Sequence, residues 1–264
     1  MAHVADGASC RPRTGDMHLL NQDIRGGTGG EGMSPAEFFR YSLGRSPSRH
    51  AREAAARIRR ARARAVLDVG CGVGLSLKQV AVEVPGCELL CGCDADERLL
   101  EYAVQDAPPD KDGPPPADCL CWVCNGPASL PFADGVFDFV FSEGALHHFA
   151  HHERMIAEMW RVLAPGGELV VMDLNPRAVL ARGFSLFARV KNAMGLASKG
   201  EMALAESISG AFDSARIVRD AKRAGVHFET ARTLAAVYYS ARKRGFPEGR
   251  MTCASSGGRT GGRG

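Results

Sequence analysis

Short apolar segments alternate with helix-like segments along the middle of the chain, and this alternation constrains the fold more than any other feature. The apolar segments are almost continuous in hydrophobic residues, as is typical of strands covered on both faces of a sheet. Strands that alternate with helices at this spacing indicate a parallel sheet with helices packed on both faces. The expected strands are 65–70, 87–94, 119–125, 135–143 and 168–174, with helices at 75–84, 96–105 and 152–163 and an APGG turn at 164–167.

The segments outside this alternation set the domain boundaries. Residues 1–32 and 246–264 are rich in glycine and polar residues without periodicity, which predicts a disordered N-terminal extension and a disordered tail. Residues 33–64 have helical periodicity and are expected to form N-terminal helices before a domain at 65–245. Within that domain, residues 177–215 are too long for a simple crossover and are expected to form a helical lid insertion.

The composition excludes several classes of protein. The chain has 264 residues and a formal net charge of +3, so its overall charge does not predict nucleic acid as a partner. It has no run of about 18 apolar residues, so no membrane span is expected, and the N-terminus lacks the apolar core of a signal peptide. Nine cysteines are an odd number, which favours reduced thiols and a cytoplasmic location.

A glycine-rich loop, VLDVGCGVG at 66–74, follows the first expected strand and indicates where a ligand binds. In open parallel sheets, ligands bind beyond the carboxyl ends of the strands, where the strand order reverses. Asp68 precedes the glycines, and its carboxylate would repel a pyrophosphate but suits a ligand with an ammonium and a sulfonium group. Asp94 ends the second strand, 94 − 74 = 20 residues after Gly74, at the spacing of an acid that binds ribose hydroxyls. S-adenosylmethionine has these groups and no phosphate.

Four stretches resemble the class I S-adenosylmethionine-dependent methyltransferases, and most closely the broad type 11 group. The resemblance implies an α/β, Rossmann-like fold with a seven-stranded, mostly parallel sheet, an antiparallel last strand and helices on both faces. Residues 226–234 and 235–243 would supply the final hairpin. The matching stretches are VLDVGCGVG (66–74), CGCDADERLLEYA (91–103), LPFADGVFDFVFSEGALHHF (130–149) and MWRVLAPGGELVVMDLNP (159–176).

The resemblance also implies S-adenosylmethionine as the cofactor and assigns its contacts. In this family the glycine loop contacts the methionine and ribose moieties, and the acid that ends the second strand binds the ribose hydroxyls. Residues after the fourth strand line the reaction site. The cofactor-binding residues expected from the resemblance are Asp68, Gly70, Cys71, Gly72, Gly74, Asp94, Ala95 and Ser142.

The stretch before the fourth strand departs from the family pattern. Members often carry G-D-A-x-x-LPF there, with the Asp at the adenine amino group, whereas this chain has NGPASLPF. Gly126 stands in place of the Asp, and Pro127 has no N–H to donate. A slip of one residue would let Asn125 make the adenine contact; without it, cofactor affinity would be weak.

Three residues just past the fourth strand are candidate catalytic residues. The protein must hold the nucleophile near attack distance, and an oxygen or nitrogen nucleophile also needs a base to accept its proton. The candidate bases are Glu143, His147 and His148, of which the histidines titrate near neutrality. In the alternative interpretation the LHH segment is structural, so the sequence assigns no catalytic base.

The sequence does not predict a metal site. The four histidines of HHFAHHE (147–153) have i, i+4 spacing, but a loop at 150–151 would keep them off one helix face. The alternate cysteines in 87–94 and 119–125 are interpreted as small buried hydrophobes. The arginines of 52–64 are interpreted as the solvated face of a helix.

These features predict an enzyme that transfers a methyl group from S-adenosylmethionine to a small, apolar molecule. An apolar face of the insertion, formed with three aromatic residues near the N-terminus, would act as a lid. The residues of this lid are Phe184, Leu186, Phe187, Val190 and Met194, with Phe38, Phe39 and Tyr41. Three alternatives stay open: an inactive cofactor-binding protein of the same fold, an RNA or protein methyltransferase, and an NAD oxidoreductase, which Asp68 and the short glycine loop disfavour. The acceptor, the atom methylated and the oligomeric state are left open.

Overall fold

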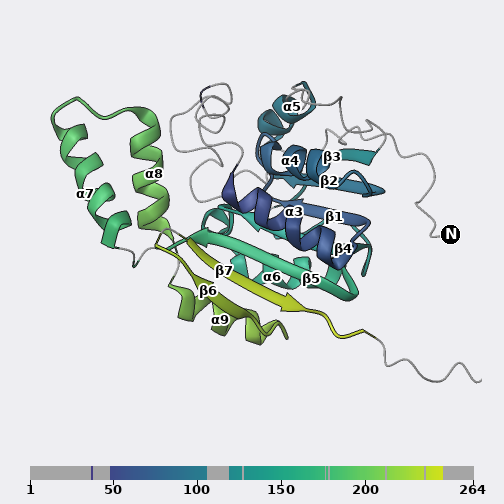
Figure 1. The fold of residues 1–264 in the computed structure, drawn as a ribbon. Coiled ribbons are helices and arrows are strands. Elements are labelled where there is room, and N and C mark those ends of the chain that lie inside the picture. The colour runs from purple at the N-terminus through teal and green to yellow at the C-terminus, as the bar shows by residue number, and fades with distance from the viewer. Residues whose placement is uncertain are drawn as a thin grey trace, which may run out of the picture.

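A computed structural model describes residue 37 and residues 48–105, 119–126, 128–175, 177, 179–211, 213–234 and 236–245. These residues form a seven-stranded sheet in the order β3-β2-β1-β4-β5-β7-β6 (Figure 1). All neighbouring strands are parallel except β7, which is antiparallel to both β5 and β6, so the fold class expected from the sequence is confirmed. The strands are β1 (Ala65–Val69), β2 (Leu89–Asp94), β3 (Leu120–Cys124), β4 (Phe137–Glu143), β5 (Leu163–Leu174), β6 (Glu229–Arg232) and β7 (Ala236–Arg242).

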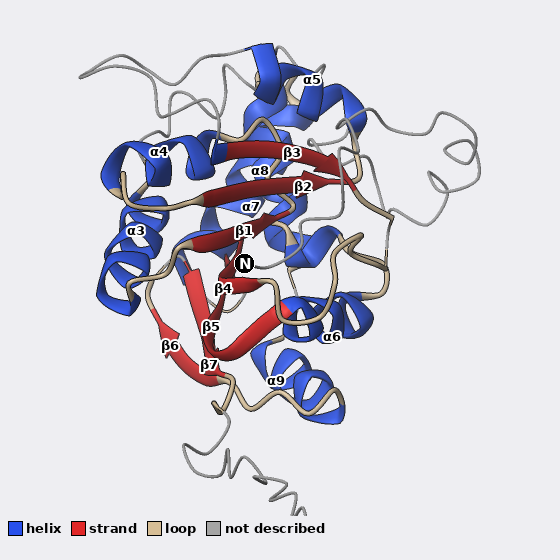
Figure 2. Ribbon diagram, turned by 90° about the vertical axis from the view of Figure 1, so that its right-hand side faces the viewer, coloured by secondary structure: helices blue, strands red, loops and turns tan. Residues whose placement is uncertain are grey.

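Helices cover both faces of this sheet (Figure 2). Helices α3 (Arg49–Ala61) and α4 (Leu75–Glu83) lie on one face, and α6 (His152–Val162) and α9 (Ser214–Arg223) lie on the other. Helix α5 (Glu97–Gln105) contacts β2 and β3. Helices α7 (Val179–Ala193) and α8 (Lys199–Gly210) pair with each other and project from the body in Figure 1.

Adjacent strand residues supply the cores of opposite faces. Val66 packs with the α3 and α4 side chains, whereas Leu67 packs with those of α6 and α9. Both are fully buried, as a doubly covered parallel strand requires. This alternation fixes which side chains point to each face at the carboxyl ends of the strands, where the candidate site lies.

Helix α3 is held against the sheet by small residues and ended by a left-handed cap. The hydroxyl of Ser48 accepts a hydrogen bond from the N–H of Ala51 at 2.8 Å, which caps the first turn. Ala55 and Ile58 are fully buried on the sheet side. Arg62 ends the helix with φ of 54°, and Arg57 forms ion pairs with Glu53 and Glu168.

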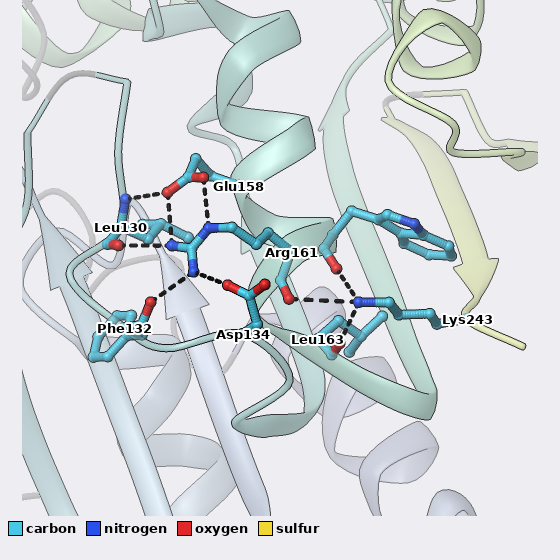
Figure 3. A network of polar contacts seen from close by, with 8 residues as sticks. Leu130, Phe132, Asp134, Glu158, Arg161, Leu163 and Lys243 are labelled. Atoms are coloured by element: carbon cyan, nitrogen blue, oxygen red, sulfur yellow. Dashed lines mark hydrogen bonds and ion pairs between the residues drawn. The ribbon is translucent and has the colours of Figure 1, made fainter. Parts of the chain in front are cut away.

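The junction between α6 and β5 is held by two cations at the amino-terminal edge of the parallel strands (Figure 3). The Arg161 guanidinium donates to Glu158, to Asp134 and to the carbonyl oxygens of Leu130 and Phe132. The ammonium group of Lys243 donates to carbonyl oxygens at the C-terminal end of α6, which also favours the helix dipole.

Two elements differ from the expectation. The APGG segment at 164–167 lies inside β5, because Leu163 already pairs with Phe137 before the register shifts to Glu168 opposite Phe139. Helix α9 was not expected as a separate element, although its buried Ile217 and Ala221 are spaced as on one helix face.

Several expectations lie outside the described residues: the extensions at 1–32 and 246–264, the part of the expected N-terminal helices at 33–36 and 38–47, which contains Phe38, Phe39 and Tyr41, and Pro127. Among the helices in the described ranges, none is long and apolar enough to cross a membrane.

Candidate active site

The candidate site lies at the carboxyl ends of β1, β2 and β4. The sheet runs from β1 through β2 to β3 on one side and from β4 to β5 on the other, so the strand order reverses between β1 and β4. The loop between β1 and α4 has three glycines in the left-handed region: Gly70 at φ +75°, Gly72 at +54° and Gly74 at +75°. Such angles strain any residue with a Cβ atom. A Cβ atom on Gly74 would also lie only 2.3 Å from the Trp122 ring, so this loop needs glycine there.

Hydrogen bonds to β2 hold the glycine loop in place. The N–H groups of Gly70 and Cys71 both donate to the Cys93 carbonyl oxygen, at 2.8 and 3.0 Å. The Gly72 N–H donates to one oxygen of the Asp94 carboxylate at 2.8 Å, and the Asp96 N–H donates to the other at 2.9 Å. Asp94 therefore orders the loop and the turn that contains Ala95, whose N–H also bonds this carboxylate.

Burial changes the acidity of both loop carboxylates. Asp94 is buried, and desolvation raises its pKa from 3.8 to about 6 although backbone N–H groups oppose the shift. Asp68 is 1% exposed, and desolvation, followed by the charges of Glu143 and Asp94, raises its pKa well above 3.8. The same burial raises the pKa of the Cys71 thiol. Asp68 and Asp94 thus lie close together, and no cation is among the groups that shift the pKa of Asp68.

Four buried polar atoms at this end of the sheet have no hydrogen-bond partner within the described part of the chain. Leaving such an atom unpaired costs about 1–3 kcal/mol, so each is a candidate ligand contact. Asn125 illustrates the geometry: its N–H bonds the Asp94 carbonyl oxygen and its Nδ2 bonds that of Gly126, which leaves Oδ1 unpaired. The four atoms are Asp68 Oδ2, Asn125 Oδ1, Ser142 Oγ and His147 Nε2.

Glu143 makes two strong hydrogen bonds that tie helices to the sheet. Its carboxylate accepts from the Ser48 hydroxyl at 2.9 Å and from the Ser76 hydroxyl at 2.6 Å. Ser48 is the N-cap of α3 and Ser76 lies in the first turn of α4. Glu143 therefore positions the starts of both helices.

His147 and His148 have different environments although their rings lie 4.0 Å apart. His147 Nδ1 lies 2.6 Å from one oxygen of Asp173, and the backbone N–H of His147 donates to the other at 3.0 Å. Asp173 thus fixes the ring, with Nδ1 as donor and Nε2 as the available acceptor. Burial, with the neighbouring His147, lowers the pKa of His148 to about 4, so His148 is a weaker base.

The remaining histidines and the cysteines serve other contacts. Helix α6 begins at His152, and the Nε2 atom of His152 lies 3.0 Å from Asp220 of α9, so this ring joins two helices. Cys91 and Cys121 are direct register partners on β2 and β3. All seven described cysteines are free thiols. Within the ranges described above, three or more His, Cys, Asp or Glu residues nowhere gather as metal ligands.

Sequence reasoning did not single out four residues that shape this site: Ser48, Ser76, Trp122 and Asp173. Asp173 had a detectable signal, because it is an acid near the end of a strand, as Asp68 and Asp94 are. The other three act through contacts between distant segments and have no local signal.

Comparison with known proteins agrees with this geometry. The family model described as a methyltransferase domain matches residues 67–171. The probable tRNA methyltransferase 9B of Mus musculus is 39% identical over 109 residues, which are 40% of this chain and 21% of that protein. The demethylmenaquinone methyltransferase of Thermus thermophilus is 34% identical over 115 residues, 42% of this chain and 47% of that protein. The chain thus spans less than half the length of both relatives.

The fold also has solved neighbours. Phosphoethanolamine N-methyltransferase 2 of Haemonchus contortus, solved in complex with S-adenosyl-L-methionine, superposes with a TM-score of 0.57 at 16% identity. The match covers 80% of this chain and 57% of that one. Strand order, glycine loop and family match agree, and the chain therefore contains, over residues 67–171, a class I methyltransferase domain of the S-adenosylmethionine-dependent, type 11 group.

Proposed function

We propose that the protein binds S-adenosylmethionine at the carboxyl ends of β1 and β2 and transfers its methyl group to a small, apolar acceptor. The observation that carries this proposal is the buried Asp68 carboxylate, with one unpaired oxygen, behind a loop of three left-handed glycines. A pyrophosphate there would meet like charge in a desolvated site, whereas an ammonium or sulfonium group would be attracted.

The residues present fit the cofactor at each of its parts. Asp94 accepts three backbone N–H bonds, and a carboxylate has about four acceptor sites, so it can still accept from a ribose hydroxyl. Asn125 Oδ1 is the acceptor available for an adenine amino group, which supports the one-residue slip over a contact at Gly126. Gly70, Cys71 and Gly74 would approach the methionine and ribose moieties as backbone, and Ser142 would contact the cofactor from β4. The solved neighbour from Haemonchus contortus contains this cofactor.

When bound, S-adenosylmethionine supplies an electrophilic methyl group, and the chain supplies position and a proton acceptor. His147 Nε2 is buried and unpaired, and Asp173 fixes the ring through Nδ1. A histidine oriented in this way acts as a general base, because the carboxylate stabilises the imidazolium that forms. We assign this role to His147 rather than to Glu143, which positions the starts of α3 and α4, or to His148.

The apolar nature of the acceptor is supported by the relative named demethylmenaquinone methyltransferase. Helix α8 contacts the 3-10 turn Leu146–His148, which supports a role for the α7–α8 pair as a lid over the reaction site. The relative named probable tRNA methyltransferase 9B supports the alternative of an RNA acceptor. The free thiols support a cytoplasmic location.

Calorimetric titration tests the cofactor. We expect S-adenosylhomocysteine to bind and NAD not to bind, and Asp94→Ala or Gly72→Arg to weaken binding at least tenfold. Asp138→Ala is a matched control, because Asp138 also accepts two backbone N–H bonds but at the opposite edge of the sheet. Tight binding of NAD alone would reject the proposal.

Methyl transfer is then measured with radiolabelled S-adenosylmethionine and three kinds of acceptor: quinones that lack a ring methyl group, small carboxylic acids, and total tRNA. Transfer to a quinone is the expected result. Transfer to tRNA alone would favour the RNA alternative, and cofactor binding without transfer to any acceptor would favour an inactive binding protein.

A further inference from the structure

Helix α7 forms the outer side of the projecting α7–α8 pair (Figure 1). Its inner face packs on α8 through small side chains: Ala188 is fully buried, and the buried Ser185 hydroxyl contacts the Ala205 carbonyl oxygen. Ion pairing of Lys191 with Glu201 holds the two helices together at the far end. The orientation of α7 is therefore fixed, and its opposite face is turned away from the body.

That outer face is apolar and exposed. Leu186 is 66% exposed, Phe187 57%, Val190 50% and Met194 65%. At about 100° per residue, these four positions fall within a band of about 100° on the helix circumference. We call these four residues the outer stripe. Phe184, which the sequence placed with them, lies outside the band and is half-buried. The sequence predicts that all five residues face the pocket as a lid, and this is wrong for the outer stripe, which is exposed and turned away from the body. A continuous apolar band of this kind on a projecting helix indicates a binding surface.

Every charged residue of α7 beside the outer stripe is positive. The helix contains Arg182, Arg189 and Lys191 and no acidic residue. By their helical positions, the two arginines border one side of the stripe. Lys191 borders the other side, with its Nζ 5.7 Å from the Phe187 ring centroid, but its charge is paired with Glu201 of α8. An apolar band bordered by cations is typical of helices that lie in the interface of a membrane.

We propose that the outer stripe of α7 binds the surface of an anionic lipid bilayer, with the four apolar side chains among the acyl chains and the flanking Arg182 and Arg189 at the headgroups. A second copy of the chain is a poorer occupant, because pairing two stripes would bring arginine and lysine against their like. A lipid surface supplies both an apolar layer and negative charge. The inference does not depend on methyl transfer.

Vesicle flotation of the full chain tests this proposal without any turnover. Vesicles of phosphatidylcholine alone are compared with vesicles that contain about one third phosphatidylglycerol, at constant salt. We expect at least tenfold more protein on the anionic vesicles. Leu186→Ser/Val190→Ser is expected to reduce that binding at least tenfold, and Arg182→Glu to reduce the preference for anionic lipid. Circular dichroism checks that each variant remains folded.

Val104→Ser is the matched control, because Val104 on α5 is also 66% exposed but lies far from α7 (Figure 1). It should bind as the unaltered protein does. The proposal is overturned if the unaltered protein does not bind anionic vesicles, or if the stripe variant binds them equally well. A lipid-free dimer that the stripe variant abolishes, without vesicle binding, would assign the surface to a second copy and would also overturn it.

Discussion

Cofactor affinity should depend on pH through the two buried loop acids, and the magnitude follows from Asp94. Its pKa of about 6 means that the carboxylate is ionised at pH 8 but only about one molecule in ten is ionised at pH 5. Ribose hydroxyls donate to the ionised form. We therefore expect S-adenosylhomocysteine to bind about tenfold more weakly at pH 5 than at pH 8. Asp68 acts with the same sign, because a bound ammonium group favours its ionised form.

The same shift has the opposite sign for the stability of the ligand-free protein. Asp94 binds protons more readily in the folded state than at its ordinary pKa of 3.8, so its contribution to stability is lost as pH rises from about 4 to about 6. The difference of 6 − 3.8 = 2.2 in pKa corresponds to about 3 kcal/mol. Bound cofactor should offset part of this loss, so its thermal stabilisation should be larger at pH 8 than at pH 5.

Isothermal titration calorimetry with S-adenosylhomocysteine from pH 8 to pH 5 measures the affinity, and buffers of different ionisation enthalpy measure the protons released on binding. Asp94→Asn should bind more weakly and lose the part of the pH dependence that belongs to Asp94, which leaves the proton release of Asp68. An affinity of the unaltered protein that stays constant between pH 8 and pH 5 would refute the reasoning, because neither acid would then contact the ligand.

Three further changes test separate contacts. Gly92→Ala would place a Cβ atom 2.5 Å from the Trp122 ring, so we expect it to cost about 1–3 kcal/mol in urea unfolding. The same change should cost much less in a Trp122→Leu background, and an equal cost in both backgrounds would contradict this packing. Arg161→Lys loses the forked donor, so the melting temperature should fall while the affinity for S-adenosylhomocysteine stays unchanged. A parallel loss of affinity would contradict a purely structural role for Arg161. Asp173→Asn should lower kcat about a hundredfold with little change in KM and shift the pH profile of kcat, because His147 loses its orienting charge. An unchanged pH profile would exclude the His147–Asp173 pair as the base.

The sequence predicted those parts of the fold that depend on local patterns. The strands at Ala65–Val69 and Phe137–Glu143 follow from short apolar runs, and the glycine loop follows from residues that tolerate positive φ. Local patterns also place the start of α6 at His152. Strand β5 was placed too late, because its pairing begins before the APGG segment and depends on Phe137 across the sheet.

The candidate site could be predicted only where a single segment carries the signal. Asp68 and Asp94 each stand at a strand end, so topology alone brings them together. The engagement of Glu143 by Ser48 connects residues 95 positions apart, and no spacing rule reveals it. The choice between His147 and His148 likewise depends on Asp173, 26 positions further on from His147. Contacts of this kind decide which candidate is a base and which is a positioning residue.

The ligand-free site combines features that each oppose folding: left-handed glycines, carboxylates with raised pKa and unpaired buried atoms such as Ser142 Oγ. Several such groups at one site indicate a ligand site, because each unpaired buried atom costs about 1–3 kcal/mol. At the opposite edge of the sheet, Arg161 and Lys243 satisfy several carbonyl oxygens at once (Figure 3). Because the stabilising contacts and the unsatisfied groups lie at opposite ends of the same strands, ligand binding should raise stability without changing the packing of α6 on the sheet.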